Sequence, residues 1–130
     1  MTDDLVQFLR DRLDEDEKVA RAADGDEIEA SDPVRGAKFL TLRGDHHDRH
    51  VGELPSALAD HIARHDPARI IAEVEMKRSI VEKYERALDN SRAHPDDLAS
   101  SGALLALHGV VHLLAAPHAN HPQFRQEWRP

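Results

Sequence analysis

The chain lacks cysteine altogether and is poor in aromatic residues, which make up 4% of its 130 positions. Without cysteine, disulfides, thiolate metal sites and cysteine nucleophiles are excluded. With so few aromatic residues, the core must be built from leucine, isoleucine, valine and alanine, and such a core favours helices over β-sandwiches and barrels. The length is typical of one domain, so we expect residues 1–130 to form a single domain.

Sequence motifs that identify a reaction are also absent. The chain contains no G-x-S-x-G, no P-loop and no G-x-G-x-x-G. Carboxylates are numerous, but their positions are typical of exposed helix faces, and no pair is singled out for acid–base catalysis. The sequence therefore predicts no catalytic residue and no organic cofactor, and it favours a protein that is not an enzyme.

Basic residues are scarce at the start of the chain. Residues 1–32 contain 12 acidic and 4 basic residues, whereas residues 33–130 contain 13 of each, so the net charge of −8 arises from the first quarter. Two interpretations stay open: a solvated helix face, or an acidic surface that inhibits a basic nucleic-acid-binding partner. We do not expect direct nucleic-acid binding, because the basic residues of the central region alternate with glutamates.

The spacing of apolar residues predicts the fold class. Leu5, Phe8, Leu9 and Leu13 indicate an amphipathic helix over residues 2–23, with Gly25 as its stop. Glycines and prolines then punctuate residues 24–55, where segments 37–44 and 51–54 either pair as a hairpin or belong to an irregular loop. We therefore expect a mainly α fold, a small bundle of three or four helices with an irregular or β-hairpin insert around residues 24–55.

Two further helix starts follow this insert. Ser56 is placed to cap a helix to about residue 65, and Asp66-Pro67 is typical of a second start, for residues 67–89. Whether these are two helices or one kinked helix stays open at this point. In the C-terminal tail, Phe124 and Trp128 lie four apart, and we expect Trp128 to pin the tail onto the helices.

Residues 98–116, which form most of the last expected helix, contain no charged side chain. This helix starts at Asp96 or at Ser100 and Ser101, and it ends before Pro117. Residues 98–116 are long enough to raise the question of a membrane span. We expect none, because two serines, two glycines and two histidines interrupt the stretch. A helix that is apolar all round is typical of the centre of a bundle, and we expect that position.

Histidines give the most specific pattern in the chain. His61 and His65 are four apart, as are His108 and His112, so each pair lies on one face of a helix. With the two histidines that follow, they form the candidate ligand set for zinc or another transition metal: His61, His65, His108, His112, His118 and His121. Neither pair has the zincin form, because no glutamate follows its first histidine. Polar helix edges are the alternative interpretation, and the loop with His46, His47, Asp48 and His50 is a weaker candidate.

Three stretches resemble a known family. They are DLVQFLRDRLDEDEKVARAA, HIARHDPARIIAEVEMKR and LLALHGVVHLLAAPHANHPQFRQEWRP. Together they cover more than half of the chain and are similar to the small actinobacterial and actinophage proteins catalogued as domain of unknown function 6221. The resemblance implies an actinomycete or phage cytoplasm, and it brings no activity, substrate or ligand.

These patterns together predict a small cytoplasmic accessory or adaptor protein that acts through protein–protein contacts, of phage or mobile-element origin. The acidic start of the chain lacks the basic region of a secretory signal, which is consistent with the cytoplasm. A homodimer through an under-covered apolar helix face is one expected arrangement. Two alternatives remain: a His-ligated transition-metal-binding module, and an acidic inhibitor of a basic nucleic-acid-binding partner.

Overall fold

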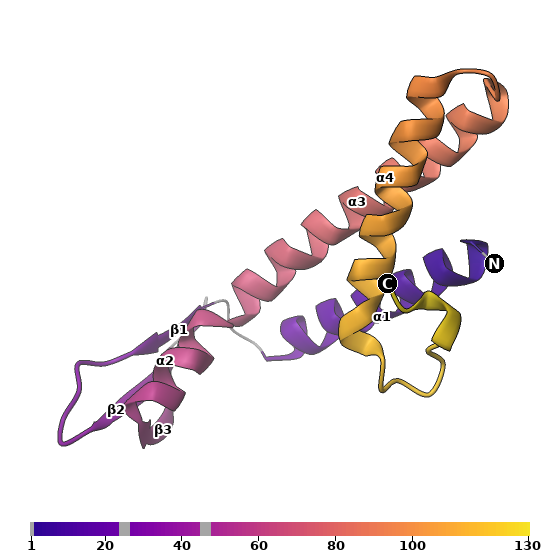
Figure 1. The fold of residues 1–130 in the computed structure, drawn as a ribbon. Helices are drawn as coiled ribbons and strands as arrows, with labels where there is room; N and C mark the ends of the chain where they lie inside the picture. The colour runs from indigo at the N-terminus through magenta and orange to yellow at the C-terminus, as the bar shows by residue number, and fades with distance from the viewer. Residues whose placement is uncertain (1, 24–26, 45–47) are drawn as a thin grey trace. The chain divides into compact units, whose positions relative to one another are not determined.

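The computed structural model describes residues 2–23, 27–44 and 48–130. These residues form four α-helices and three strands (Figure 1). The elements are α1 (Thr2–Ala22), β1 (Glu27–Ala30), β2 (Ala37–Arg43), β3 (Arg49–Pro55), α2 (Ser56–Arg64), α3 (Pro67–Ala93) and α4 (Leu98–Ala115), followed by the 3-10 helices η1 (Ala116–His118) and η2 (Gln126–Trp128). The mainly helical fold with a β insert is thus confirmed.

The chain forms two compact units. The first unit contains Met1–Asp14 and Glu75–Pro130, and the second contains Glu15–Val74. The boundaries fall within α1 and within α3, so each of these helices contributes to both units.

The core of the first unit gathers side chains that are far apart in the sequence. Its buried members are Leu5, Val6, Phe8, Leu9, Val81, Tyr84, Val111, Ala115, Phe124 and Trp128. Four of these ten are aromatic, so the predicted core of leucine, isoleucine, valine and alanine is wrong: the few aromatic residues of the chain are concentrated in this core. The ring centroids of Phe8 and Trp128 lie 4.9 Å apart, and Trp128 is only 4% exposed. The expectation that the single tryptophan pins the tail onto the helices is therefore confirmed.

A three-stranded antiparallel sheet lies in the second unit, with the order β1-β2-β3. The hairpin of β2 and β3 was one of the two predicted alternatives, whereas β1 was not predicted. Helix α2 packs against all three strands, and Leu40 of β2 and Ala59 of α2 are both buried. This packing gives the short hairpin the hydrophobic partner that an isolated pair of strands lacks.

The junction after α2 contains two separate helices. His65 ends α2, and the Asp66 carboxylate accepts a hydrogen bond from the backbone N–H of Arg69 at 2.9 Å, which caps α3 with Pro67 in its first turn. The predicted cap at Ser56 is wrong. Ser56 is the first residue of α2 after Pro55, and its hydroxyl is buried without a hydrogen-bond partner among the described residues.

The start of α4 also differs from the prediction. Asp97, rather than Asp96 or the two serines, is the N-cap, and its carboxylate accepts hydrogen bonds from the backbone N–H groups of Ala99 and Ser100. The Ser100 hydroxyl donates to the same carboxylate at 2.5 Å and accepts from the side-chain amide of Asn90 at 2.7 Å. These bonds join the end of α3 to the start of α4.

The predicted central position of α4 is wrong. The segment Leu98–His118 has a mean hydropathy of 1.6, yet only 17% of its apolar window is buried. Within the described residues it is the one helix long and apolar enough to cross a membrane, judged by length and composition alone. Only one side of α4, with Val111 and Ala115, joins the core of the first unit, so the opposite side is uncovered.

Candidate functional site

The uncovered side of α4 is an uncharged apolar surface. Leu98 is 87% exposed, Leu105 is 74% exposed and Leu113 is 60% exposed. Gly102, Ala106 and Gly109 are exposed between them on the same side of the helix. We call these six residues the α4 outer face. Because α4 contains no Asp, Glu, Lys or Arg, this face offers apolar contact and no ion pairing.

The two glycines of the α4 outer face leave open space above the helix backbone. A Cβ atom built at Gly102 or at Gly109 meets no atom within 4 Å, so neither glycine is required by packing inside the chain. A glycine costs a helix about 1 kcal/mol relative to alanine. Exposed glycines between exposed leucines allow another backbone to approach closely. The seven-residue spacings Leu98–Leu105 and Gly102–Gly109 were the signal of this face in the sequence.

Two histidines lie beside this face. His108 is exposed and His112 is half-buried, and their ring centroids are 4.4 Å apart. The Nε2 atom of His108 lies 3.2 Å from the Nε2 atom of His112. The Nδ1 atom of His112 lies 2.9 Å from the backbone carbonyl oxygen of Trp128, which joins the pair to the buried tail.

These contacts assign the protons of the neutral pair. A carbonyl oxygen only accepts hydrogen bonds, so Nδ1 of His112 carries a proton and donates it to Trp128. The Nε2 atom of His112 then holds a lone pair, which accepts the hydrogen bond from Nε2 of His108. The two Nε2 atoms therefore face each other across one hydrogen bond, and the bond from Nδ1 to the tail fixes the orientation of the His112 ring.

The other predicted pair has a different geometry. His61 and His65 have ring centroids 4.5 Å apart, but Nδ1 of His65 donates to the backbone carbonyl of His61 at 2.8 Å. This pair belongs to the second unit, whereas His108 and His112 belong to the first. The same four-residue spacing thus gives one pair whose Nε2 atoms face each other and one pair whose hydrogen bond is local to the end of α2.

The remaining predicted ligands pack against Phe8. The ring of His118 contacts Phe8 edge-on at a centroid distance of 6.1 Å, and that of His121 does so at 5.6 Å. His121 accepts a hydrogen bond from the backbone N–H of Gln123 on Nδ1, and its Nε2 atom contacts Arg12. His121 is therefore half-buried and packed against Phe8 of the core of the first unit.

No group of three or more His, Cys, Asp or Glu residues within the described ranges could hold a metal ion. His108 and His112 are thus a two-ligand pair in one chain. Of the loop candidate, His46 and His47 lie outside the described residues, and the Nδ1 atom of His50 contacts the hydroxyl of Thr41 at 3.3 Å. Metal binding by the predicted histidines stays a prediction.

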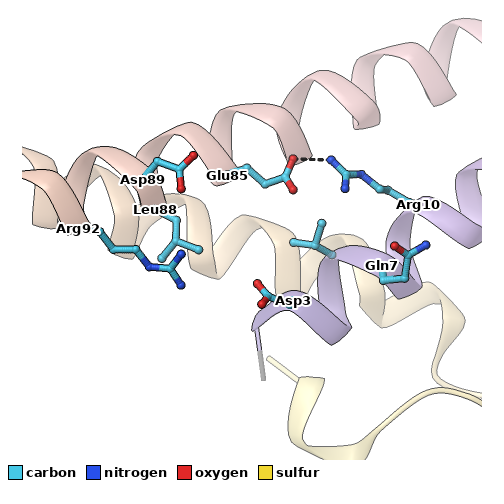
Figure 2. A pocket seen from close by; sticks show the side chains of 8 residues that line it. Asp3, Gln7, Arg10, Glu85, Leu88, Asp89 and Arg92 are labelled. Atoms are coloured by element: carbon cyan, nitrogen blue, oxygen red, sulfur yellow. Dashed lines mark hydrogen bonds and ion pairs between the residues drawn. The ribbon is translucent and has the colours of Figure 1, made fainter.

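Figure 2 shows a pocket of about 270 Å³ between α1 and α3 in the first unit. Arg10 and Glu85 form an ion pair at 2.5 Å across it, while Asp3, Asp89 and Arg92 lie around its rim. The lining mixes acidic and basic groups, and Glu85 is already paired with Arg10. The pocket therefore offers no evident catalytic pair.

Ion pairs join several acidic and basic side chains of α1 and α3. Asp14 pairs with Arg78 at 2.6 Å, and Arg21 pairs with Glu17 at 2.9 Å. On α3, Arg69 pairs with Glu73 at 2.9 Å. These charges are paired within the chain, and both the acidic-inhibitor alternative and the expected lack of direct nucleic-acid binding stay predictions.

Comparison with known proteins adds a family to this geometry. A family model described as a family of unknown function, DUF6221, matches residues 2–130. No curated protein and no solved structure matches the chain. The resemblance that the three sequence stretches indicated is confirmed over nearly the whole chain.

Proposed function

The chain belongs to the DUF6221 family, and we propose that this member is an accessory protein that acts through protein–protein contacts made by the α4 outer face. The first partner of this face is a second copy of the chain. The observation that carries the proposal is the exposure of Leu98, Leu105 and Leu113 on a helix whose other side is packed into a core. Contiguous exposed apolar patches of this kind mark interaction surfaces.

The α4 outer face is complementary to itself. Gly109 lies midway between Leu105 and Leu113 along the helix, and its open side leaves room for a close crossing. If two copies of α4 cross antiparallel at Gly109, Leu105 of each copy meets Leu113 of the other. Such a two-fold arrangement is the commonest form of protein self-association. The absence of charge on α4 gives no basis for selecting an oppositely charged partner instead.

The expected affinity is modest. Burial of a leucine side chain contributes about 1.5–3 kcal/mol, so the partly exposed leucines of two copies contribute roughly 9 kcal/mol in total. Association costs about 4–15 kcal/mol in lost translational and rotational freedom. At the smallest of these costs the face leaves about 5 kcal/mol, which corresponds to a weak dimer with a Kd of roughly 0.2 mM.

The test is sedimentation equilibrium of the untagged protein in chelator, between about 5 and 500 μM. We expect a concentration-dependent shift from monomer to dimer that Leu105→Asp abolishes, because the aspartate would be buried unpaired against an apolar face. The matched control is Leu58→Asp, which changes a 46% exposed leucine on α2 and is expected to leave the dimer intact. A wild-type chain that stays monomeric throughout, or one that partitions onto phosphatidylcholine vesicles without self-association, contradicts the proposal.

A further inference from the structure

We infer that His108 and His112 supply two of the four ligands of a zinc site, and that the same two histidines of a second copy supply the others. This inference rests on the proposed self-association through the α4 outer face, and it adds a metal ion that would stabilise the dimer. The site lies beside that face.

The separation of the two nitrogens suits a tetrahedral ion. Zinc binds histidine nitrogen at about 2.0–2.1 Å, so two ligands of a tetrahedral site lie about 3.3–3.4 Å apart. Two neighbouring ligands of an octahedral site with the same bond length lie only about 2.8–3.0 Å apart. The observed Nε2–Nε2 distance of 3.2 Å between His108 and His112 is nearer to the tetrahedral value.

The surroundings of His112 resemble those of a metal ligand. Histidines that bind metals commonly donate their other ring N–H to a carbonyl or a carboxylate, which fixes the tautomer and the ring orientation. His112 makes such a bond from Nδ1 to the carbonyl oxygen of Trp128 at 2.9 Å. The lone pair on its Nε2 atom is thereby directed toward His108.

Zinc would replace a proton that already lies between the rings. His108 donates its Nε2 proton to His112 when the pair is empty, so its Nε2 lone pair must be freed before the ion binds. His108 is exposed, and exchange with solvent can move that proton to Nδ1 without a change in charge. Both ligands then remain neutral imidazoles, and no electron transfer or bond cleavage is involved.

A single chain leaves the site half complete. The described residues offer no third histidine or carboxylate that converges on the pair, whereas structural zinc sites normally have four protein ligands. The antiparallel crossing at Gly109 supplies the missing half, because it places the His108–His112 pair of each copy beside that of the other. Four imidazoles around one ion are the expected result.

The test measures zinc binding and mass together. Untagged protein at about 50 μM is titrated with zinc chloride in a calorimeter, and its mass is measured by light scattering with and without zinc. We expect one zinc per two chains and a doubling of mass. Free zinc at a hundred times its dissociation constant should tighten the dimer about 100-fold. Cobalt(II) in place of zinc should give the visible absorption of a tetrahedral ion.

Two double variants provide the comparison. His108→Ala with His112→Ala is expected to abolish both stoichiometric zinc binding and the zinc-dependent gain in mass. His61→Ala with His65→Ala removes a pair of equal spacing and is expected to change neither quantity.

The outcomes separate this inference from the proposed function. If the chelated protein dimerises through Leu105 but zinc adds nothing, the metal site is refuted and the contact function stands. If zinc binds one per chain without a change in mass, the shared site is refuted. If zinc doubles the mass of Leu105→Asp as fully as that of the wild type, the ion bridges chains without the α4 outer face, and the arrangement inferred here is wrong.

Discussion

Leu105 and Val111 lie six residues apart on α4, yet Leu105 is 74% exposed and Val111 is fully buried. Val111 joins Ala115, Phe8 and Trp128 in the core of the first unit. Leu105 is exposed to solvent, and the two exposed glycines of the α4 outer face lie on either side of it along the helix. The two sides of the helix are similarly apolar, so hydrophobicity alone does not distinguish them. The packing of α1 and the tail against α4 therefore determines which side of the helix is buried. The other side stays exposed and can contact a second molecule.

The largest expected loss of stability comes from a substitution in the core that buries one side of α4. Trp128→Ala should lower the free energy of unfolding by about 3–5 kcal/mol, because it removes the largest side chain packed on Phe8 and Phe124. Urea denaturation followed by circular dichroism measures this loss. Trp128→Phe is the control: it keeps an aromatic ring and removes an indole N–H that is buried without a partner in the described part of the chain, so the loss should be smaller. An alanine variant as stable as the wild type would mean that the tail does not hold α4.

An alanine-to-leucine substitution on each side of α4 compares the buried side with the exposed side directly. Ala115 is fully buried, so Ala115→Leu should overpack the core and lower the free energy of unfolding by about 1–3 kcal/mol. Ala106 is exposed on the α4 outer face, so Ala106→Leu should change that free energy by less than about 0.5 kcal/mol. Both variants are compared by urea denaturation at low micromolar concentration, where the monomer predominates. Equal losses at the two positions would remove the distinction between the two sides.

The smallest expected effect concerns the cap that starts α4. Hydrogen bonds from the Ser100 hydroxyl and from the Ala99 backbone N–H lower the pKa of Asp97. A carboxylate whose pKa is lower in the folded state contributes stability above its unfolded pKa of about 3.9, and this contribution is lost as the pH falls through the folded pKa. Asp97→Asn should therefore lower the melting temperature slightly at pH 6 and less at pH 2. A difference between wild type and variant that grows toward low pH would contradict this assignment.

Much of the fold could be predicted from local patterns. The spacing of Leu5, Phe8, Leu9 and Leu13 predicted α1, and Asp66-Pro67 predicted the start of α3, because caps and stripes depend on neighbouring residues. Strand β1 was missed because its four residues, EIEA, carry too little pattern to distinguish a strand from a loop. Its pairing with β2 is a long-range contact that short sequence windows do not contain.

The candidate site was predicted only in part. The four-residue spacing identified His108 with His112 and His61 with His65 as equivalent pairs, since spacing fixes only that two side chains share a helix face. The approach of the Trp128 carbonyl to His112, sixteen residues away, distinguishes the first pair by fixing the proton on Nδ1. The exposed side of α4 was missed for a different reason: the apolar composition of the helix favoured burial on all sides.

Local sequence patterns alone predict which segments are helical and where α3 is capped, because these properties depend on residues within a few positions of each other. Only the tertiary structure decided which side of α4 meets Phe8 and Trp128, and hence that Leu98, Leu105 and Leu113 face outward. A uniformly apolar helix has no preferred direction until other elements pack against it. The direction of α4, and with it the contact surface, is therefore a property of the packed chain rather than of the helix.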